Sequence, residues 1–505
     1  MARICLCLTA GTIKRDLEIL NQYRKYADMA ELRVDCLEPN ERLLIRRFPV
    51  QAGLPVILTI RRDIDGGYFT GGEGARVNLL ARGLAYAEAD RRRNFAFVDI
   101  EEDFNVPSLE EAAHTFGTRI IRSYHNINGV DENLSAKIKG MIHTGDEIVK
   151  VAVTAHSTAD MLRLFQAGKE CAAQEKILIC MGRYGVCGRI LAEHFGSYLS
   201  YASALSETDA PRAAAGQTDI RELAEFYRFK SITRYTKVFG VVGFPLVASS
   251  SPAFFNTIFR LEGIDAVYVP FPADSIDAFM ELAGALGISG FSVTVPYKEA
   301  VLPFISEQSA EVRSIGACNT LSRCPQGWLG VNTDTRGFSD SLLAFIGKTS
   351  LKRQKLTIIG AGGAAKAAAA EVYRLGGKAL ILNRTVHKAR DLAAAYNFAW
   401  GGIDNRGIDM MHRYQDIIIQ TTSAGMEGSD SSDPLESYHF SGRELVMDLV
   451  YKPEVTPFLK RAGDAGCRYI NGYDMLIRQA RYQYSHFMQK EFPPQLLSRV
   501  QFDRS

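Results

Sequence analysis

A single lysine stands in the middle of an apolar run that has the composition of a buried strand. The run covers residues 147–153, and Lys150 is its central residue. A lysine in this position must reach solvent, pair with a buried acid, or be held with a lowered pKa so that its neutral amine can attack a carbonyl. Because most strand lysines point to solvent, Lys150 alone does not indicate catalysis.

Polar side chains at the ends of neighbouring strand-like runs change that interpretation. Glu31 and Arg33 end one run, and Arg61 ends the next. His125 ends a third run. Charge placed repeatedly at the ends of buried strands is how a β/α barrel builds an active site. A lysine near a histidine suits imine chemistry with acid–base assistance, and arginines suit a substrate carboxylate. Two further candidates follow later strands: Arg189 and Gln217.

The order of segments in the first half predicts the fold that positions these side chains. Strand-like runs alternate with helical patterns at residues 75–91, 134–143 and 158–173. About eight β/α units within roughly 225 residues are typical of a closed parallel barrel. We therefore expect an α/β fold that begins with a (β/α)8 TIM barrel over residues 1–230 and has its last helix at residues 218–226. The expected strands are residues 4–10, 29–35, 55–61, 95–101, 118–125, 148–155, 177–183 and 198–205.

A second α/β arrangement starts after a polar, basic stretch at residues 230–237. The apolar run 355–359 precedes a glycine-rich turn and an alanine-rich helix, which together form the first unit of a dinucleotide fold. We expect a substrate-binding subdomain at residues 236–347, completed by residues 470–505, and a Rossmann subdomain at residues 348–469. The turn contains Gly360, Ala361, Gly362, Gly363 and Ala364.

The end of the next strand in this fold indicates the cofactor. NAD-specific folds place an acidic residue there to bind the ribose hydroxyls. Here the strand at residues 379–382 is followed by Asn383, Arg384 and Thr385, with Lys388 close behind. Because a guanidinium and an ammonium suit the 2′-phosphate of NADP, we expect NADP(H).

Composition limits the other partners. The 505 residues carry a net charge of +2, which argues against a nucleic-acid partner. The nine cysteines lack metal-ligand spacing, so we expect no metal. No apolar run approaches the roughly 18 residues that a membrane span needs, and no targeting segment is recognisable. We expect a cytoplasmic monomer or homodimer that acts on small molecules.

The first half resembles type I 3-dehydroquinate dehydratase. The resemblance implies that Lys150 forms a Schiff base with the ketone of 3-dehydroquinate and that His125 transfers the protons. It also implies that Glu31 and Arg33 hold ring hydroxyls, while Arg189 and Gln217 hold the carboxylate, and that the product is 3-dehydroshikimate. The matching motifs are residues 31–35, 123–125, 149–153, 181–189 and 216–217.

Three departures from that family concern the same site. Asp65 stands where a glutamate usually orients the histidine, so we assign Asp65 this role. Ala213 and Ala215 replace a serine and a proline of the loop before Gln217, and Asn126 replaces an aspartate. Because the lysine and the histidine are present, we expect activity with weaker substrate binding.

Seven short motifs of the second half form a recognisable set: residues 243–252, 290–298, 316–320, 332–334, 421–426, 447–451 and 472–479. With these motifs, the second half resembles shikimate dehydrogenase across residues 236–505. The resemblance implies that Lys298 and Asp334 pass a proton to the carbonyl oxygen as NADPH delivers hydride. The implied substrate contacts are Ser249 and Ser251 for the carboxylate, and Ser292, Thr294, Asn319, Asp334 and Gln479 for the hydroxyls. The implied cofactor contacts beyond the glycine-rich turn include Thr422, Tyr451 and Gly472.

Here too the sequence departs from the pattern, and two alternatives stay open. Ala248 and Phe255 stand where histidines are common, and Ser292 stands where asparagine is common. Together the halves resemble the fused bifunctional enzymes of the shikimate pathway. One alternative is a second domain that oxidises quinate as well as shikimate with NAD, and Arg384 argues against it. The other is a silent metabolite sensor, which should have lost catalytic residues that are all present: Lys150, His125, Lys298 and Asp334.

Overall fold

The chain folds into two compact units, residues 1–288 and residues 289–500. The computed structural model describes the chain except for residues 86–89, 208–212, 215, 247–248, 428–431 and 501–505. The positions of Ala215 and Ala248 therefore lie outside the described residues. None of the described helices is long and apolar enough to cross a bilayer.

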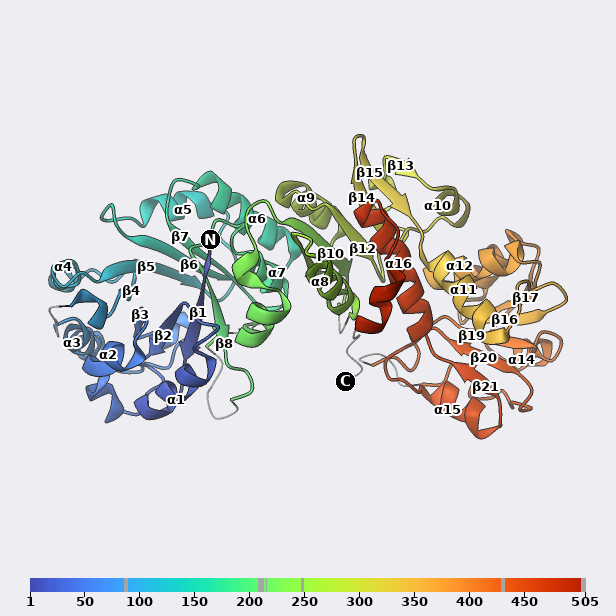
Figure 1. The fold of residues 1–505 in the computed structure, drawn as a ribbon, viewed down its shortest axis with the longest axis horizontal. Coiled ribbons are helices and arrows are strands. Elements are labelled where there is room, and N and C mark those ends of the chain that lie inside the picture. Colours follow the sequence, from blue (N-terminus) through green and yellow to red (C-terminus); the bar gives the residue numbers. More distant parts are fainter. Residues whose placement is uncertain (86–89, 208–212, 215, 247–248, 428–431, 501–505) are drawn as a thin grey trace. The chain divides into compact units, whose positions relative to one another are not determined.

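A closed parallel barrel forms most of the first unit (Figure 1). Strands β1 to β7 pair in chain order, β1 also pairs with β8, and a bridge between Lys176 and Ser197 closes the ring. All eight predicted strands are present, with ends that differ by no more than two residues. The strands are β1 (Arg3–Leu8), β2 (Met29–Arg33), β3 (Val56–Thr59), β4 (Phe97–Glu101), β5 (Arg119–Asn126), β6 (Ile148–Thr154), β7 (Lys176–Met181) and β8 (Leu199–Ser203).

Helices cover the outside of this barrel. Local capping begins several of them: the Thr12 hydroxyl accepts from the Arg15 amide, and Ser157 and Asp160 form a capping box before the sixth helix. The helices are α1 (Ile13–Tyr23), α2 (Phe48–Ala52), α3 (Glu73–Leu84), α4 (Pro107–Thr115), α5 (Leu134–Gly140), α6 (Thr158–Glu170) and α7 (Val186–Ile190).

The helix expected at residues 218–226 is wrong in its first part. The segment begins as a short strand, β9 (Thr218–Asp219), because Thr218 pairs with Ala202 of β8. Only Glu222–Phe226 is helical, and this turn is a π-helix. Gln217 directly precedes β9, and the pairing of β9 with β8 holds it beside Ser203.

Alternation along the strands decides which side chains point into the barrel. Buried apolar side chains from successive strands meet in one interior cluster, which includes Cys7, Ile57, Phe97, Ile148 and Tyr201. Because side chains alternate between the two faces of a strand, residues two positions further along point inward as well. This places the polar groups of the strands in the same interior space.

The first unit continues beyond the barrel with two β/α repeats. Strands β10 (Lys237–Gly243) and β11 (Ala266–Pro272) are parallel, with α8 (Ser251–Glu262) between them and α9 (Ile276–Leu286) after them. Phe255 is fully buried on α8, and its ring stacks on Tyr268 with centroids 4.5 Å apart. The substitution noted at Phe255 therefore adds to the core.

The second unit begins with a small sheet and two helices. Its strands are β12 (Gly290–Val293), β13 (Glu307–Gln308), β14 (Thr320–Cys324) and β15 (Gly327–Val331). Helix α10 (Ala310–Ile315) lies between β13 and β14, and α11 (Asp334–Ile346) follows β15. The chain returns at its C-terminal end as α16 (Tyr473–Met488). A Cβ atom at Gly337 of α11 would lie 2.8 Å from the Cβ of Gln479, so this glycine permits the close approach of α16.

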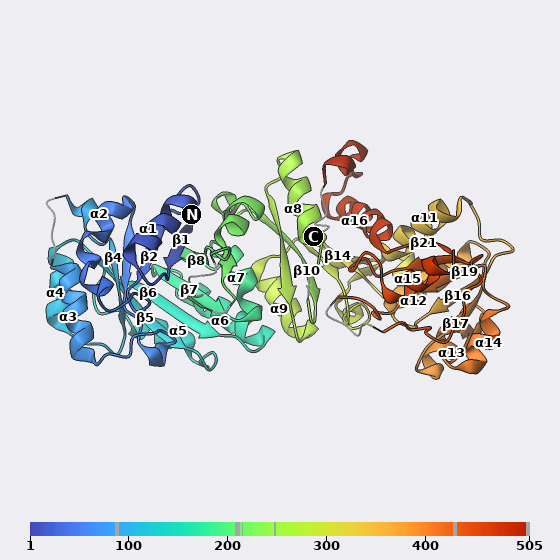
Figure 2. The same cartoon turned by 90° about the horizontal axis from the view of Figure 1, so that it is seen from below.

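A six-stranded parallel sheet forms the rest of the second unit. Its order is β18-β17-β16-β19-β20-β21, the doubly wound order of dinucleotide folds. Ile358 and Ile417 face one layer of helices, whereas Ile359 and Ile418 face the other. In Figure 2, α13 and α14 lie near β17, and both helices contact β17 and β18. The strands are β16 (Lys355–Ile359), β17 (Lys378–Leu382), β18 (Ala399–Gly401), β19 (Ile417–Gln420), β20 (Leu445–Asp448) and β21 (Arg468–Ile470), and the helices are α12 (Gly363–Arg374), α13 (Val386–Ala394), α14 (Asn405–Met411) and α15 (Pro457–Asp464).

Candidate active sites

Lys150 points into the barrel and pairs with a buried acid. Its Nζ lies 2.7 Å from Asp99 Oδ2 and 3.7 Å from Glu31 Oε1. The ring of Tyr201 lies 4.7 Å from the same nitrogen. Of the three possibilities that the sequence leaves for this lysine, the structure shows pairing with an acid.

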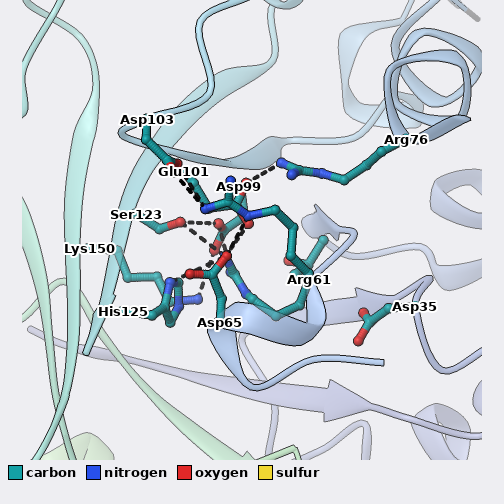
Figure 3. Close-up of polar contacts among 12 residues, drawn as sticks. Asp35, Arg61, Asp65, Arg76, Asp99, Glu101, Asp103, Ser123, His125 and Lys150 are labelled. Carbon is teal, nitrogen blue, oxygen red and sulfur yellow. Dashed lines mark hydrogen bonds and ion pairs between the residues drawn. The ribbon is translucent and has the colours of Figure 1, made fainter. Parts of the chain in front are cut away.

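A network of charges surrounds Asp99 and fixes it (Figure 3). Arg61 Nη2 lies 2.7 Å from Asp99 Oδ1 in an ion pair, and Arg61 Nη1 donates to Glu101 Oε1 at 2.6 Å. Ser123 donates to Asp99 at 2.6 Å, and Arg76 forms a second ion pair with Glu101. Burial raises the pKa of the Asp99 carboxyl, but Arg61 and Lys150 outweigh burial, so the pKa lies well below its usual value. Asp99 is therefore a carboxylate.

His125 lies at the end of β5 beside this network. Arg61 Nη1 is 3.4 Å from its Nδ1. Burial, then the positive charges of Arg61 and Lys150, hold the pKa of His125 well below its usual range. The ring is therefore neutral near neutral pH and can accept a proton.

The expected contact between Asp65 and His125 is not among the hydrogen bonds of the described residues. Asp65 instead accepts from Arg62 Nε at 2.6 Å. The shorter aspartate follows β3 in a turn where Arg62 is three residues away, and the ion pair forms locally. Arg61, rather than Asp65, contacts the histidine ring.

Two groups expected to hold a carboxylate are also buried. Arg189 is 4% exposed, and its Nε and Nη2 have no hydrogen-bond partner within the described part of the chain. Burying a cation without an acid is costly, so this guanidinium suits an anionic ligand. Gln217 accepts from Ser203 Oγ at 2.5 Å and donates to Cys7 Sγ at 3.0 Å.

Glu31 and Arg33 are held by their own partners. Glu31 accepts from Thr59 at 2.9 Å, and Arg33 makes a bidentate pair with Asp35 at 3.0 and 2.7 Å. Arg33 Nη1 also lies 3.5 Å from the carbonyl oxygen of Ala213. Both side chains are thus fixed on β2 before any substrate arrives.

A second cluster of polar side chains lies in the second unit. Lys298 Nζ is 2.5 Å from Asp334 Oδ2. Asn319 Nδ2 lies 2.8 Å from Asp334 Oδ1 and 3.2 Å from Gln479 Oε1. The lysine follows β12, the aspartate begins α11, and Gln479 comes from α16. The structure therefore brings four predicted residues from separate segments together.

The remaining predicted substrate contacts lie nearby in the chain or in the first unit. Ser292 on β12 is 3.1 Å from Gln483 Oε1, and Thr294 is half-buried two residues later. In the first unit, Ser251 is the first residue of α8 and Ser249 precedes the helix, and Ser249 Oγ accepts from the Ser251 amide at 3.3 Å.

The glycine-rich turn has the form that a pyrophosphate site requires. Gly360 has φ of +115°, and a Cβ atom there would lie 2.5 Å from Thr421 Oγ1, so only glycine fits. Within the described part of the chain, no side chain caps the N-terminus of α12 at Gly362, so its first amides can bind an anion. A Cβ atom at Gly363 would lie 3.1 Å from Lys298 Cδ. The turn and the lysine–aspartate pair are therefore adjacent.

The predicted nucleotide contacts lie around the same end of the sheet. Arg384 and Lys388 are exposed beyond β17, and neither has an acidic partner in the described ranges. Asn383 Nδ2 donates to the Thr385 carbonyl at 3.0 Å and shapes this turn. Three further predicted cofactor contacts follow the strands β19, β20 and β21, and they are Thr422, Tyr451 and Gly472, respectively. The Gly472 amide donates to the Val450 carbonyl oxygen at 2.9 Å.

Sequence reasoning missed several groups of the first site. Asp99 and Glu101 on β4 and Ser123 on β5 were not among the candidates, although all three contact Arg61. Their alternation with the apolar residues Phe97 and Ile121 is the signal that could have found them. Among the described residues, no group of three or more potential metal ligands is placed to hold a metal ion.

Comparisons with known proteins match both halves of the chain. The family description Type I 3-dehydroquinase matches residues 4–234. Shikimate dehydrogenase substrate binding domain matches residues 241–321, and Shikimate / quinate 5-dehydrogenase matches residues 343–449. A bifunctional 3-dehydroquinate dehydratase/shikimate dehydrogenase of Arabidopsis thaliana, named as chloroplastic, is 31% identical over 520 residues, covering 98% of this chain and 83% of the relative.

The chain belongs to the family of bifunctional 3-dehydroquinate dehydratases/shikimate dehydrogenases. This bifunctional enzyme carries two activities of the shikimate pathway, 3-dehydroquinate dehydratase and shikimate dehydrogenase, and the predicted fold and function are confirmed. The second half alone is 36% identical to a shikimate dehydrogenase (NADP(+)) of Geobacter metallireducens, covering 53% of this chain and 96% of that relative. It is 37% identical to a shikimate dehydrogenase (NADP(+)) of Pyrococcus abyssi, covering 53% of this chain and 98% of that relative.

Proposed function

We propose that Lys150 performs the dehydration as a covalent catalyst. The single observation that carries this proposal is a buried lysine inside the barrel, paired with Asp99 at 2.7 Å and close to a neutral histidine. The amine attacks the ketone of 3-dehydroquinate and expels water to give an iminium. The iminium withdraws electrons, so the adjacent carbon–hydrogen bond becomes acidic.

His125 removes this proton and then returns a proton to the departing hydroxyl. Its neutral ring is suited to the first step, and the imidazolium formed there is suited to the second. Elimination releases the hydroxyl as water. A further water then hydrolyses the iminium, which regenerates Lys150 and releases 3-dehydroshikimate.

The other buried groups bind and orient the substrate. Arg189 has free donors and holds the carboxylate together with Gln217. Glu31 and Arg33 hold ring hydroxyls, and Arg61 orients both Asp99 and His125. Asp65 contributes through Arg62 rather than through the histidine.

In the second reaction, we propose that Lys298 and Asp334 protonate the carbonyl oxygen of 3-dehydroshikimate. NADPH, when bound, supplies the hydride. Asp334 accepts from both Lys298 and Asn319, so it orients the ammonium group that donates the proton. Ser292, Thr294, Asn319 and Gln479 hold ring hydroxyls.

The residues of the nucleotide subdomain fit NADP(H). Amides of the turn Gly360–Gly363 and of the first turn of α12 would bind the pyrophosphate. Arg384 and Lys388, exposed and without acidic partners in the described ranges, would bind the 2′-phosphate beside Asn383 and Thr385. Ala361, Ala364 and Thr422 line the same turn region, and Tyr451 and Gly472 would lie near the nicotinamide.

Replacing Arg384 with aspartate tests this cofactor assignment. The aspartate removes one charge-assisted contact, worth about 1.5–3 kcal/mol, and repels the phosphate. We expect the Michaelis constant for NADPH to rise at least about tenfold, with a smaller effect on NADH. Steady-state kinetics with each nucleotide measures this, and Arg390→Asp, on the exposed surface of α13, is the matched control. A wild-type enzyme that prefers NADH would refute the assignment and favour the NAD-dependent alternative.

We further propose three functional domains: residues 1–230 for dehydration, residues 236–347 with 470–505 for substrate binding, and residues 348–469 for nucleotide binding. The three family descriptions match residues 4–234, 241–321 and 343–449, so one match gives way to the next near the start of the second and third proposed domains. The close packing of Gln479 on Gly337 and its contact with Asn319 support the return of the C-terminal segment to the substrate-binding part.

A further inference from the structure

Asp99 is the carboxylate nearest to the Lys150 nitrogen, and it is held firmly from its other side. Its Oδ2 lies 2.7 Å from Nζ, while its Oδ1 accepts from Ser123 and lies 2.7 Å from Arg61. The Asp99 side chain is completely buried. The two oxygens therefore have separate partners, and the oxygen that faces Lys150 cannot turn away without breaking two other contacts.

Imine formation leaves the charge at this nitrogen unchanged. Lys150 begins as an ammonium ion, and the ketone oxygen departs as water with two of the protons of that ammonium group. The product is an iminium ion that again carries one positive charge. A carboxylate placed to neutralise the ammonium ion is therefore also placed to neutralise the iminium ion.

We propose that Asp99 is the counter-ion of the Lys150 nitrogen both before and after imine formation. This inference rests on the covalent function proposed for Lys150. Asp99 acts as a positioning residue, because it contacts the lysine rather than the substrate. Glu31 cannot replace it, since Glu31 lies 3.7 Å from the nitrogen and is engaged by Thr59 and Cys7.

The charged groups around Lys150 make the loss of Asp99 easy to detect. Arg61, two residues after the end of β3, and His125 from β5 face the same space, and Glu31 and Arg33 approach from β2. Tyr201 from β8 and Cys5 from β1 complete the surroundings. Without Asp99, the cation at the Lys150 nitrogen would face Arg61, with Glu31 at 3.7 Å as its remaining carboxylate neighbour.

The pH dependence of iminium trapping tests the proposal. The full-length enzyme is mixed with 3-dehydroquinate and cyanoborohydride across a pH series, and the adduct on Lys150 is measured by mass spectrometry. With Asp99→Asn, we expect the whole profile to move to lower pH by at least about one unit, because both cations lose their counter-ion. Asp103→Asn, the same change at an exposed site paired with Arg62, should leave the profile in place.

Each outcome bears on a different claim. If a folded Asp99→Asn enzyme forms less adduct at every pH while the pH of maximum trapping stays the same as in the wild type, that result would overturn the counter-ion role and indicate a packing role. An unmodified Lys150 in the wild-type enzyme would refute the covalent function itself. If Asp99→Asn does not fold, as judged by circular dichroism, Ser123→Ala should shift the profile in the same direction by a smaller amount, and an unmoved profile would overturn the proposal.

Discussion

Lys150→Ala is expected to abolish the dehydration of 3-dehydroquinate. The substitution removes the only amine that the barrel presents near His125 among the described residues, and without an imine the proton next to the ketone is far less acidic. We expect the rate of enone formation to fall to the background level. The variant should still reduce 3-dehydroshikimate with NADPH, because Lys298 and Asp334 lie in the second unit.

Two controls accompany this variant. Lys139→Ala changes an exposed lysine of α5 and should keep both activities. Borohydride added with 3-dehydroquinate should attach substrate to wild-type Lys150 and to no residue of the Lys150→Ala enzyme. Substantial dehydration by Lys150→Ala would rule out the covalent mechanism.

Lys298→Met is expected to slow the reduction of 3-dehydroshikimate and to leave the dehydration of 3-dehydroquinate unchanged. Methionine keeps the length of the side chain but cannot donate a proton or pair with Asp334. Proton transfer by a positioned side chain contributes about 10²- to 10⁴-fold, so we expect the reduction of 3-dehydroshikimate to slow at least about 100-fold. Spectrophotometry of NADPH consumption measures this loss.

The dehydratase reaction of the Lys298→Met enzyme should be retained, since Lys150 and its partners lie in the first unit. Lys348→Met, at an exposed position after α11, serves as the matched control. A Lys298→Met enzyme that reduces its substrate at the wild-type rate would show that another group donates the proton.

The barrel strands could be predicted because buried parallel strands are continuous apolar runs. The same property explains why Asp99 was missed. Asp99 and Glu101 stand at the end of the apolar run that forms β4, where polar residues are usually read as the point at which a strand ends. Only the closed ring shows that β4 and β6 present Asp99 and Lys150 to the same interior. The distance between the Asp99 and Lys150 side chains depends on how the strands close into a barrel, and a single sequence does not give that distance.

Local interactions account for the other differences. Residue 218 was assigned to a helix from its spacing, but pairing with Ala202 makes it part of a strand. The family resemblance predicted that Asp65 orients His125, but the Asp65 carboxylate, one methylene shorter than that of a glutamate, forms an ion pair with the nearby Arg62. The lysine–aspartate pair of the second unit was predicted because its two motifs are distinctive, whereas Gln483 beside Ser292 was not singled out.

The most direct test of the bifunctional account is a single reaction that contains the enzyme, 3-dehydroquinate and NADPH. Absorbance of the enone reports the first reaction, and loss of NADPH reports the second. Without NADPH, we expect the enone to accumulate. With NADPH, we expect the enone to be consumed, one NADPH to be oxidised for each molecule reduced, and shikimate to form. Enone that accumulates equally in both reactions, or no enone in either, would contradict the account.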